Sequence, residues 1–461
     1  MDMLLSRRRF GKTLGLTAAG AAAYAQLGRS AAFAAPSDGY TAIVGIFQFG
    51  GNDGWNTVVP VDSRYAAYAQ ARNSAIVLPQ NRLVPLGGTP YALHPALQPL
   101  QAIWNDGALG VVLNTGTLYQ PITKDQYQNA PQLRPVNLMS HADEQAHWQG
   151  LRAREASSDG YMGRLYDRST QPPLPSLLSF NGSNLITMGR TSSSLVLPST
   201  GLLTDAAATA SPANSSLRAI LANGQGGAQA ALADGSSYGT VTATTASGIT
   251  AAYSQAATAN AVFSASSAVD QYFVDPSSGA ALGSDIANQL KRVARMIAAR
   301  GTLGHSRQTF FVGQGGYDTH SAQIAQQNTV LTDLGLAVAG FYTAMKALGL
   351  AQNVTAFTMS DFGRVYAGNA QGGTDHAWGN NHLVIGGALK PQTIQGVYPS
   401  LVMGGPDDAI GDGRFIPTIA QEEYIGAIAQ WHGVASSDMP YVFPNWATWS
   451  SNGRGPLNLF A

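Results

Sequence analysis

The chain has 461 residues, with 26 basic residues, 26 acidic residues, eight histidines and no cysteine. The absence of cysteine excludes disulfides, thiol catalysis and thiolate ligands, so any metal must be held by His, Asp or Glu. The balanced charge excludes the strongly basic surface that nucleic-acid binding requires.

The first 34 residues have the features of a twin-arginine export signal. Residues 6–12 read SRRRFGK, an Ala-rich apolar run follows, and Ala32-Phe33-Ala34 offers small residues for signal cleavage. The apolar run is too short for a stable membrane span. We therefore expect the twin-arginine translocase to deliver a periplasmic or secreted protein; the alternative is a chance basic tail.

The remaining chain, residues 35–461, is expected to form a single domain. Cleavage after residue 34 removes five basic residues and one acidic residue, which leaves 21 basic and 25 acidic residues and a net charge of −4. A chain of this length can bury a large core.

The first half of the chain predicts short strands and one well-marked helix start. Runs of β-branched, aromatic and aliphatic residues predict strands at 40–49, 109–113, 177–180, 185–188 and 193–197. Acidic residues follow Ser140 within one helical turn, which predicts a helix beginning there. Residues 202–282 are rich in Ala, Ser, Thr and Gly, which indicates an insertion or cap made of weak helices and loops.

The second half alternates between helix and strand patterns. Apolar residues at helical spacing predict helices over 286–297, 322–348 and 418–431, and apolar runs predict strands at 308–312, at 354–359 and from 383. This alternation is typical of right-handed crossovers. The predicted fold class is therefore α/β, with a mostly parallel central sheet covered by helices on both faces.

Three acidic residues follow predicted strands by only a few positions. They are Asp53, Asp318 and Asp361. If the strands are parallel neighbours, the three carboxylates converge at one edge of the sheet, where α/β proteins bind ligands. An isolated Asp at such a position more often stabilises a turn, but three together with nearby histidines indicate a metal site.

The histidines that accompany these acids are His320, His376 and His382. His320 lies two positions after Asp318, so both side chains point the same way on an extended segment. His376 lies in a Gly-rich loop, and Asp375 is able to orient its ring. His382 is either a ligand or a residue that hydrogen-bonds a ligand. We expect one or two divalent ions (Zn, Mn, Ca or Mg), held by Asp53, Asp318, His320, Asp361, His376 and His382.

Three further residues are candidates for catalysis. Ser140 is a possible nucleophile, because a hydroxyl at a helix N-terminus lies in a positive field that also attracts phosphate or sulfate; alternatively it only caps the helix. Asn114 either hydrogen-bonds an anionic oxygen or closes a turn. Arg364 is either an anion clamp or the partner of a structural carboxylate.

These segments, taken in order, resemble the DUF1501 proteins, a bacterial family of unknown function whose members commonly carry twin-arginine signals. The likeness spans nearly the whole mature chain. The shared segments are GGNDGWNTVVP (50–60), SHADEQAHW (140–148), QLKRVARMIAA (289–299), GGYDTHSAQ (315–323), TMSDFGR (358–364), GGTDHAWGNNHLVIGG (372–387) and GRFIPTIAQEEYIGAIAQWHGV (413–434).

That family looks like a branch of the alkaline phosphatase-like superfamily, which implies a parallel α/β core, usually two metal ions and a Ser, Thr or formylglycine nucleophile. By this resemblance, Ser140 stands at the nucleophile position. The implied metal ligands are Asp53 after the first strand, Asp318 with His320 at one site, Asp361 in the later Ser-Asp motif and His376 near the end.

The chain also departs from the superfamily pattern. Asp318 and His320 are two residues apart rather than four, and Phe362 stands where a His is expected after Asp361. His141 or His382 is the candidate to replace that histidine. No Ser-x-Pro-x-Arg run is present, which disfavours formylglycine chemistry.

Two functions follow as expectations. The first is an exported metal-dependent hydrolase of phosphate or sulfate esters, either small or borne by a polymer. The second is a non-catalytic periplasmic or cell-surface binding or assembly protein that retains the fold, which Phe362 favours.

Overall fold

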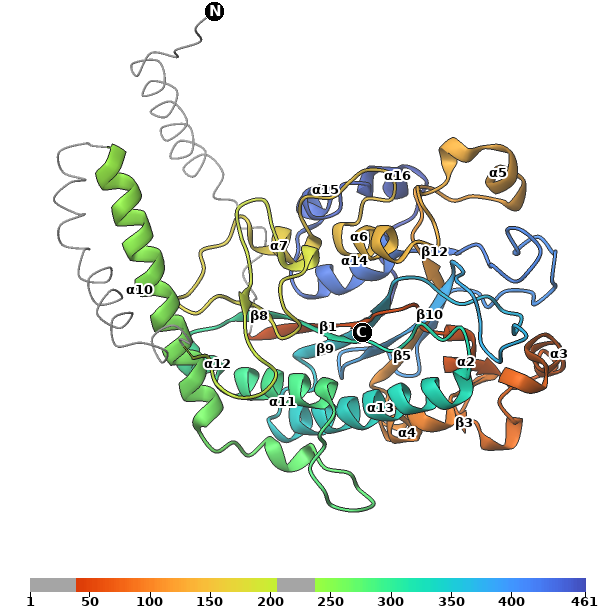
Figure 1. Ribbon diagram of the computed structural model, residues 1–461, viewed down its shortest axis with the longest axis horizontal. Helices are drawn as coiled ribbons and strands as arrows, with labels where there is room; N and C mark the ends of the chain where they lie inside the picture. Colours follow the sequence, from red (N-terminus) through yellow and green to blue (C-terminus); the bar gives the residue numbers. More distant parts are fainter. Residues whose placement is uncertain (1–38, 205–236) are drawn as a thin grey trace, which may run out of the picture.

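Figure 1 shows a computed structural model of the chain, which describes residues 39–204 and 237–461. The expected export signal at residues 1–34 and residues 205–236 of the expected insertion lie outside the described residues. Across the described ranges, no helix combines the length and the apolar character needed to cross a membrane.

The described residues contain a nine-stranded central sheet in the order β11-β5-β10-β9-β1-β8-β6-β7, with β12 paired to β5. All pairings are parallel except those of β10, which runs antiparallel to both of its neighbours. The expected mostly parallel sheet is therefore confirmed. The strands are β1 (Thr41–Gln48), β5 (Leu109–Gly116), β6 (Leu177–Ser179), β7 (Leu195–Val196), β8 (Arg307–Gln314), β9 (Val354–Ser360), β10 (Asn380–Ile385), β11 (Ile394–Gln395) and β12 (Ile419–Ala420).

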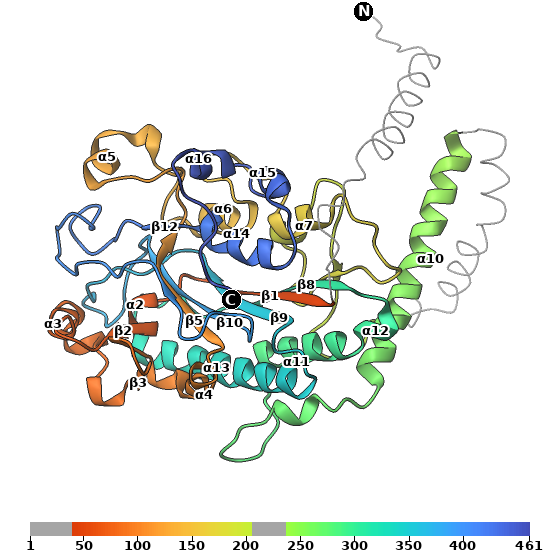
Figure 2. The same ribbon diagram turned by 180° about the vertical axis from the view of Figure 1, so that it is seen from behind.

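Helices cover both faces of this sheet (Figures 1 and 2). One face carries α4 (Gln101–Asn105), α11 (Asp285–Ala298), α12 (Arg300–Leu303) and α13 (Gln323–Ala347). The other carries α6 (His141–Gly150), α7 (Tyr161–Tyr166), α14 (Gln421–Trp431), α15 (Met439–Val442) and α16 (Trp446–Ser451). Further elements are α2 (Gly54–Thr57), α3 (Tyr65–Ile76), α5 (Lys124–Asn129), α10 (Ser237–Ser264) and a small antiparallel sheet of β2 (Val58–Pro60), β3 (Val84–Pro85) and β4 (Tyr91–Leu93).

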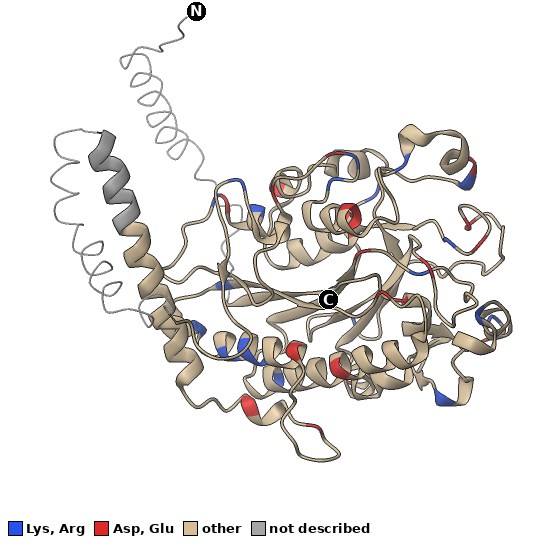
Figure 3. Ribbon diagram, in the orientation of Figure 1, with Lys and Arg blue, Asp and Glu red and all other residues tan. Residues whose placement is uncertain are grey.

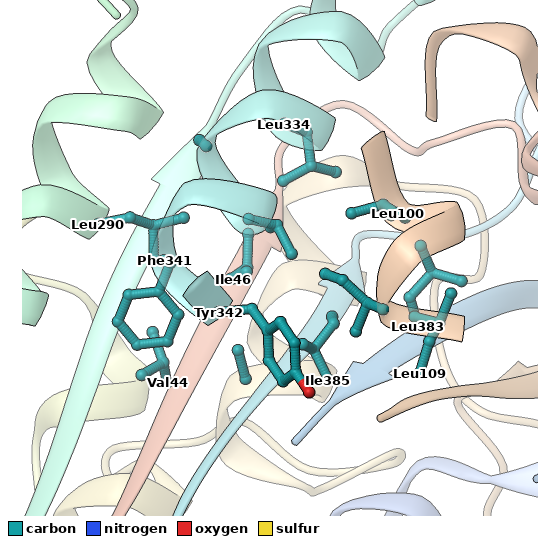
Figure 4. Packing of buried hydrophobic residues seen from close by; sticks show 14 of the residues in the cluster. Val44, Ile46, Leu100, Leu109, Leu290, Leu334, Phe341, Tyr342, Leu383 and Ile385 are labelled. Carbon is teal, nitrogen blue, oxygen red and sulfur yellow. The ribbon is translucent and has the colours of Figure 1, made fainter. Parts of the chain in front are cut away.

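The alternation of side chains along β1 explains why both faces are apolar. Val44 and Ile46 pack toward α11 and α13, together with Leu290 and Phe341 (Figure 4). The residues on either side of this pair, Ile43 and Phe47, belong to the cluster on the α14 side. A strand that is buried on both faces needs a continuous apolar run, which the sequence supplies.

The central strands β1, β5, β9 and β10 contain no Lys, Arg, Asp or Glu (Figure 3). Acidic residues instead follow directly on β9, as Asp361 does, or a few residues after β1 and β8, as do Asp53 and Asp318. The central strands thus carry no charged residue, and the candidate acidic residues lie at the edge of the sheet.

One predicted strand is wrong. Residues 185–188 form a short 3-10 helix, Leu185–Thr187, instead of a strand. The Ile186 N–H donates to the Gln149 side chain, so its backbone bonds a side chain rather than a neighbouring strand.

Candidate metal centre

Loops from parallel neighbours meet at one edge of the sheet. β1 pairs with β8 and with β9 up to the ends of the strands, where Gln48 lies opposite Gln314 on one side and Ser360 on the other. Because parallel strands end at the same edge, the loops with Asp318 and Asp361 leave the sheet at one edge, on either side of β1.

The antiparallel direction of β10 brings a further loop to this edge. The strand begins here rather than ending here, so the segment that precedes Asn380 delivers His376. The first residue of α6, His141, reaches the same place from the helical layer, as its contact with Asp361 shows.

Three imidazole rings meet at the carboxylate of Asp318. The Nε2 atoms of His320, His376 and His141 lie 3.0, 3.3 and 3.5 Å from an oxygen of Asp318. The Nε2 atoms of His320 and His376 are 3.0 Å apart. Ligand atoms of His141, Asp318 and His376 all lie within 4.8 Å of one another. We call these four residues the His/Asp cluster.

In each of these histidines the other ring nitrogen, Nδ1, faces an oxygen that can only accept a hydrogen bond. The acceptors are Asp361 Oδ2 for His141 (2.7 Å), the Met139 carbonyl for His376 (2.9 Å) and Asp375 Oδ1 for His320 (3.1 Å). A ring that donates from Nδ1 to this acceptor turns the lone pair of Nε2 toward Asp318, which is the tautomer that a metal ion between them requires. Metal-ligating histidines are oriented in this way.

The His/Asp cluster fits a divalent metal ion. Two neutral Nε2 lone pairs at 3.0 Å repel each other unless a proton or a cation lies between them. Nε2 of His141 is buried and has no hydrogen-bond partner among the described residues. Imidazole nitrogens with one carboxylate are typical ligands of zinc and similar ions, whereas Ca²⁺ and Mg²⁺ prefer sites made only of oxygen.

Two histidines of the cluster have shifted pKa values. The hydrogen bond to Asp361 raises the pKa of His141 and makes its ring a more basic ligand. Burial lowers the pKa of His376, which keeps that ring neutral at neutral pH, as metal binding requires.

Arg364 organises the carboxylate of the cluster. Its Nη2 donates to Asp318 Oδ1 at 2.5 Å. Burial alone would raise the pKa of Asp318, but the hydrogen bond and charge of Arg364 outweigh it and lower the pKa. The side chain is buried and also donates to the carbonyls of Gly50, Gly51, Tyr317 and Thr374. Of the two expected roles, the structure therefore favours the partner of a carboxylate over the anion clamp.

The family model described as a protein of unknown function, DUF1501, matches residues 40–404 of this chain. The chain belongs to the DUF1501 family. No curated protein matches it. The matched range contains the complete His/Asp cluster.

In this DUF1501 chain the predicted ligand Asp361 contacts His141. Its carboxylate is buried, and Oδ2 accepts from His141 Nδ1, from Gln145 Nε2 at 2.9 Å and from the Gly50 N–H at 3.2 Å. Asp361 thus stands behind His141 and orients it.

Asp53 does not join the cluster, which corrects the expectation that it binds metal. Its buried carboxylate accepts two hydrogen bonds from Arg72, at 2.5 and 2.8 Å, and caps α2 through the N–H groups of Trp55 and Asn56. A carboxylate that is neutralised and hydrogen-bonded in this way is a structural anchor.

His382 is also placed elsewhere, which corrects its assignment as a ligand. It lies on β10, on the face covered by α14, and its ring packs against Trp148 and stacks on Tyr424. Burial lowers its pKa to about 3. The ring is an uncharged member of the core.

Ser140 and Asn114 occupy different surroundings. Ser140 precedes α6, and its hydroxyl donates to Asp143 at 2.6 Å instead of capping the helix backbone. Asn114 lies inside β5 with a φ of 48°, and its side chain donates to the Ile416 carbonyl, so it joins β5 to the segment before β12 rather than closing a turn.

His141 is a candidate ligand that the sequence analysis named only as an alternative to His382, in place of the missing histidine. Its sequence signal is its position directly after Ser140, at the start of a helix. Phe362 takes the place where a histidine was expected, and its ring packs on His141 and His376 with centroids 4.8 and 4.5 Å apart. His141 therefore comes from another element, α6, and takes the place in the cluster that was expected for a histidine at position 362.

Proposed function

We propose that this protein is an exported metal-dependent hydrolase of phosphate or sulfate esters with an alkaline phosphatase-like arrangement of its α/β core. The observation that carries the proposal is the convergence of three imidazole Nε2 atoms on the Asp318 carboxylate. Export rests on the signal-like residues 1–34, and the ester class rests on the family resemblance.

His141, Asp318, His320 and His376 hold one divalent ion in this proposal, and zinc suits the donor set best. A divalent ion bound there supplies a Lewis acid that activates water and polarises the ester oxygen. Asp361, Asp375 and the Met139 carbonyl keep the proton of each ring on Nδ1. Arg364 keeps Asp318 ionised and fixed in place.

Water is the nucleophile that we propose, rather than Ser140. The Ser140 hydroxyl is already engaged with Asp143, and the lowered pKa of Asp143, caused first by that same hydrogen bond, makes its carboxylate a weak base. We therefore expect Ser140→Ala to retain activity, whereas an enzyme with a serine nucleophile would lose it.

The test is hydrolysis of p-nitrophenyl phosphate, bis(p-nitrophenyl) phosphate and p-nitrophenyl sulfate by protein loaded with Zn, Mn, Ca or Mg. Asp318→Asn and His376→Gln should each abolish turnover of the ester that the wild type accepts. Asp62→Asn is the matched control, because Asp62 is also a half-exposed carboxylate paired with an arginine, Arg64. Hydrolysis that survives both cluster variants would contradict the proposal.

A second function remains a candidate because Phe362 closes one side of the cluster with an apolar ring. In that case the protein holds a metal without turnover and acts as a periplasmic or cell-surface binding or assembly protein. Stoichiometric metal with no hydrolysis of any of the three ester types would favour this function.

A further inference from the structure

A buried glutamine connects the two loops that carry most of the His/Asp cluster. Gln323 is the first residue of α13, and its side chain is fully buried. Its Oε1 accepts from the hydroxyls of Thr319, at 3.2 Å, and Thr374, at 2.5 Å. Its Nε2 donates to the carboxylate of Asp53. One side chain therefore uses both ends of its amide to join three segments.

The two threonines lie next to the ligands. Thr319 stands between Asp318 and His320, and Thr374 stands two residues before His376. The Thr374 N–H also donates to the Thr319 carbonyl at 3.0 Å. A Cβ on Gly373 would lie 2.2 Å from the carbonyl carbon of His320, so only glycine allows the loops to approach this closely. A displacement of either threonine would move both loops.

The third segment provides a fixed anchor. Asp53 is held by Arg72 and by two backbone N–H groups of α2, and it lies just beyond the end of β1 in the centre of the sheet. Its carboxylate is fixed and cannot move with a loop. The Gln323 amide therefore holds the loops with Thr319 and Thr374 at a fixed distance from the edge of the sheet.

We infer that Gln323 is a positioning residue of the metal centre, which sets the distance between Asp318 with His320 on one loop and His376 on the other. Asp53 and Arg72 serve as the anchor for this contact. The inference rests on the proposed metal site, since it assigns a role in the geometry of that site.

The test compares two neighbouring buried glutamines of α13. Gln323→Met removes both hydrogen-bond functions at similar volume. Gln327→Met is the control, because Gln327 is equally buried and donates to the Asp53 carbonyl at 2.9 Å, whereas its described hydrogen bonds involve neither Thr319 nor Thr374. Chelator competition gives the metal affinity, and the visible spectrum of Co²⁺-loaded protein reports the coordination geometry.

We expect Gln323→Met to weaken metal binding by about 10- to 100-fold and to change the Co²⁺ spectrum. In other metal sites, losing a residue that orients the ligands through hydrogen bonds has an effect of this size on affinity. Gln327→Met should keep the wild-type affinity and spectrum. Equal effects in both variants would overturn the inference and indicate a general packing role. A wild type that binds no metal would overturn the proposed function itself, and this inference with it.

A milder pair of substitutions keeps the test decisive if Gln323→Met does not fold. Thr374→Val removes only the hydroxyl that bonds Gln323, and Thr374→Ser retains it. Weaker metal binding in Thr374→Val with recovery in Thr374→Ser supports the inference. Wild-type affinity and spectrum in Thr374→Val would refute it.

Discussion

Asp361 provides the most specific residue-level test of how the cluster is oriented. In Asp361→Asn the hydrogen bond to His141 Nδ1 loses its charged acceptor, so the ring is less basic and less well fixed. We expect metal binding to weaken by about 10- to 100-fold, measured by chelator competition.

The control for this variant is Gln145→Met. Gln145 donates to the same Asp361 oxygen at 2.9 Å, so this change removes a hydrogen bond from the carboxylate without removing the acceptor of His141. A loss of affinity in Gln145→Met as large as that in Asp361→Asn would contradict the role assigned to Asp361.

His382 gives a pH-dependent prediction with a definite sign. Burial lowers its pKa from about 6.5 in the unfolded chain to about 3 in the fold. The neutral ring therefore contributes its full stability above pH 6.5, and this contribution is lost as the pH falls toward 3. In His382→Phe that loss is absent, so between pH 7 and pH 5 the variant should gain about 2 kcal/mol relative to wild type.

The measurement is denaturant unfolding of both proteins at the two pH values, so that any packing cost of phenylalanine cancels in the difference. Metal content should be unchanged in His382→Phe. A pH-independent difference would show that His382 does not titrate as a buried neutral ring, and loss of metal would restore it as a ligand.

At the residue scale the sequence predicted only part of the site. Asp318, His320 and His376 could be found because they lie in Gly-rich loops that follow or precede strands. His141 was named only as one of two replacements for the missing histidine, because nothing in a sequence states that the start of a helix packs beside the ends of distant strands. Asp53 was misjudged because its neutralising partner, Arg72, lies 19 positions away on another helix.

At the scale of elements, the Asp53–Arg72 ion pair ties α3 to the N-terminus of α2. Both side chains are fully buried, so removal of one partner leaves an uncompensated charge. We expect Arg72→Met to destabilise the protein by about 3–5 kcal/mol in denaturant unfolding.

The double variant Asp53→Asn with Arg72→Met separates charge from packing. It removes both charges, so it should be more stable than Arg72→Met alone. A double variant that is less stable than the single one would mean that the pair acts mainly through its packing and hydrogen bonds.

The elements themselves were more predictable than their directions. The strand ending at Gln48 and the long helix from Gln323 were visible as apolar runs and helical spacing. The antiparallel direction of β10 was not, because an apolar run has the same appearance in both directions. That direction matters for the site, since it places the loop with His376 at the edge shared by β8 and β9.

At the scale of the whole molecule, a metal ion would join elements that are far apart in the chain. The candidate ligands come from α6, from the loop after β8 and from the loop before β10. Because the unfolded chain cannot assemble this set, metal at 100 times its Kd should stabilise the fold by about 2.7 kcal/mol. Calorimetry should show a higher Tm with metal than with a chelator, and equal Tm values would argue against a site in the fold.

The most direct measurement is the number of metal atoms per chain in the purified protein, for the wild type and for a variant with Asp318→Asn and His376→Gln. The wild type should contain about one divalent ion per chain, with zinc preferred over calcium and magnesium, and the variant should contain none. A wild type that takes up no metal even after reconstitution, or a variant that retains it, would contradict the assignment of the His/Asp cluster as a metal centre.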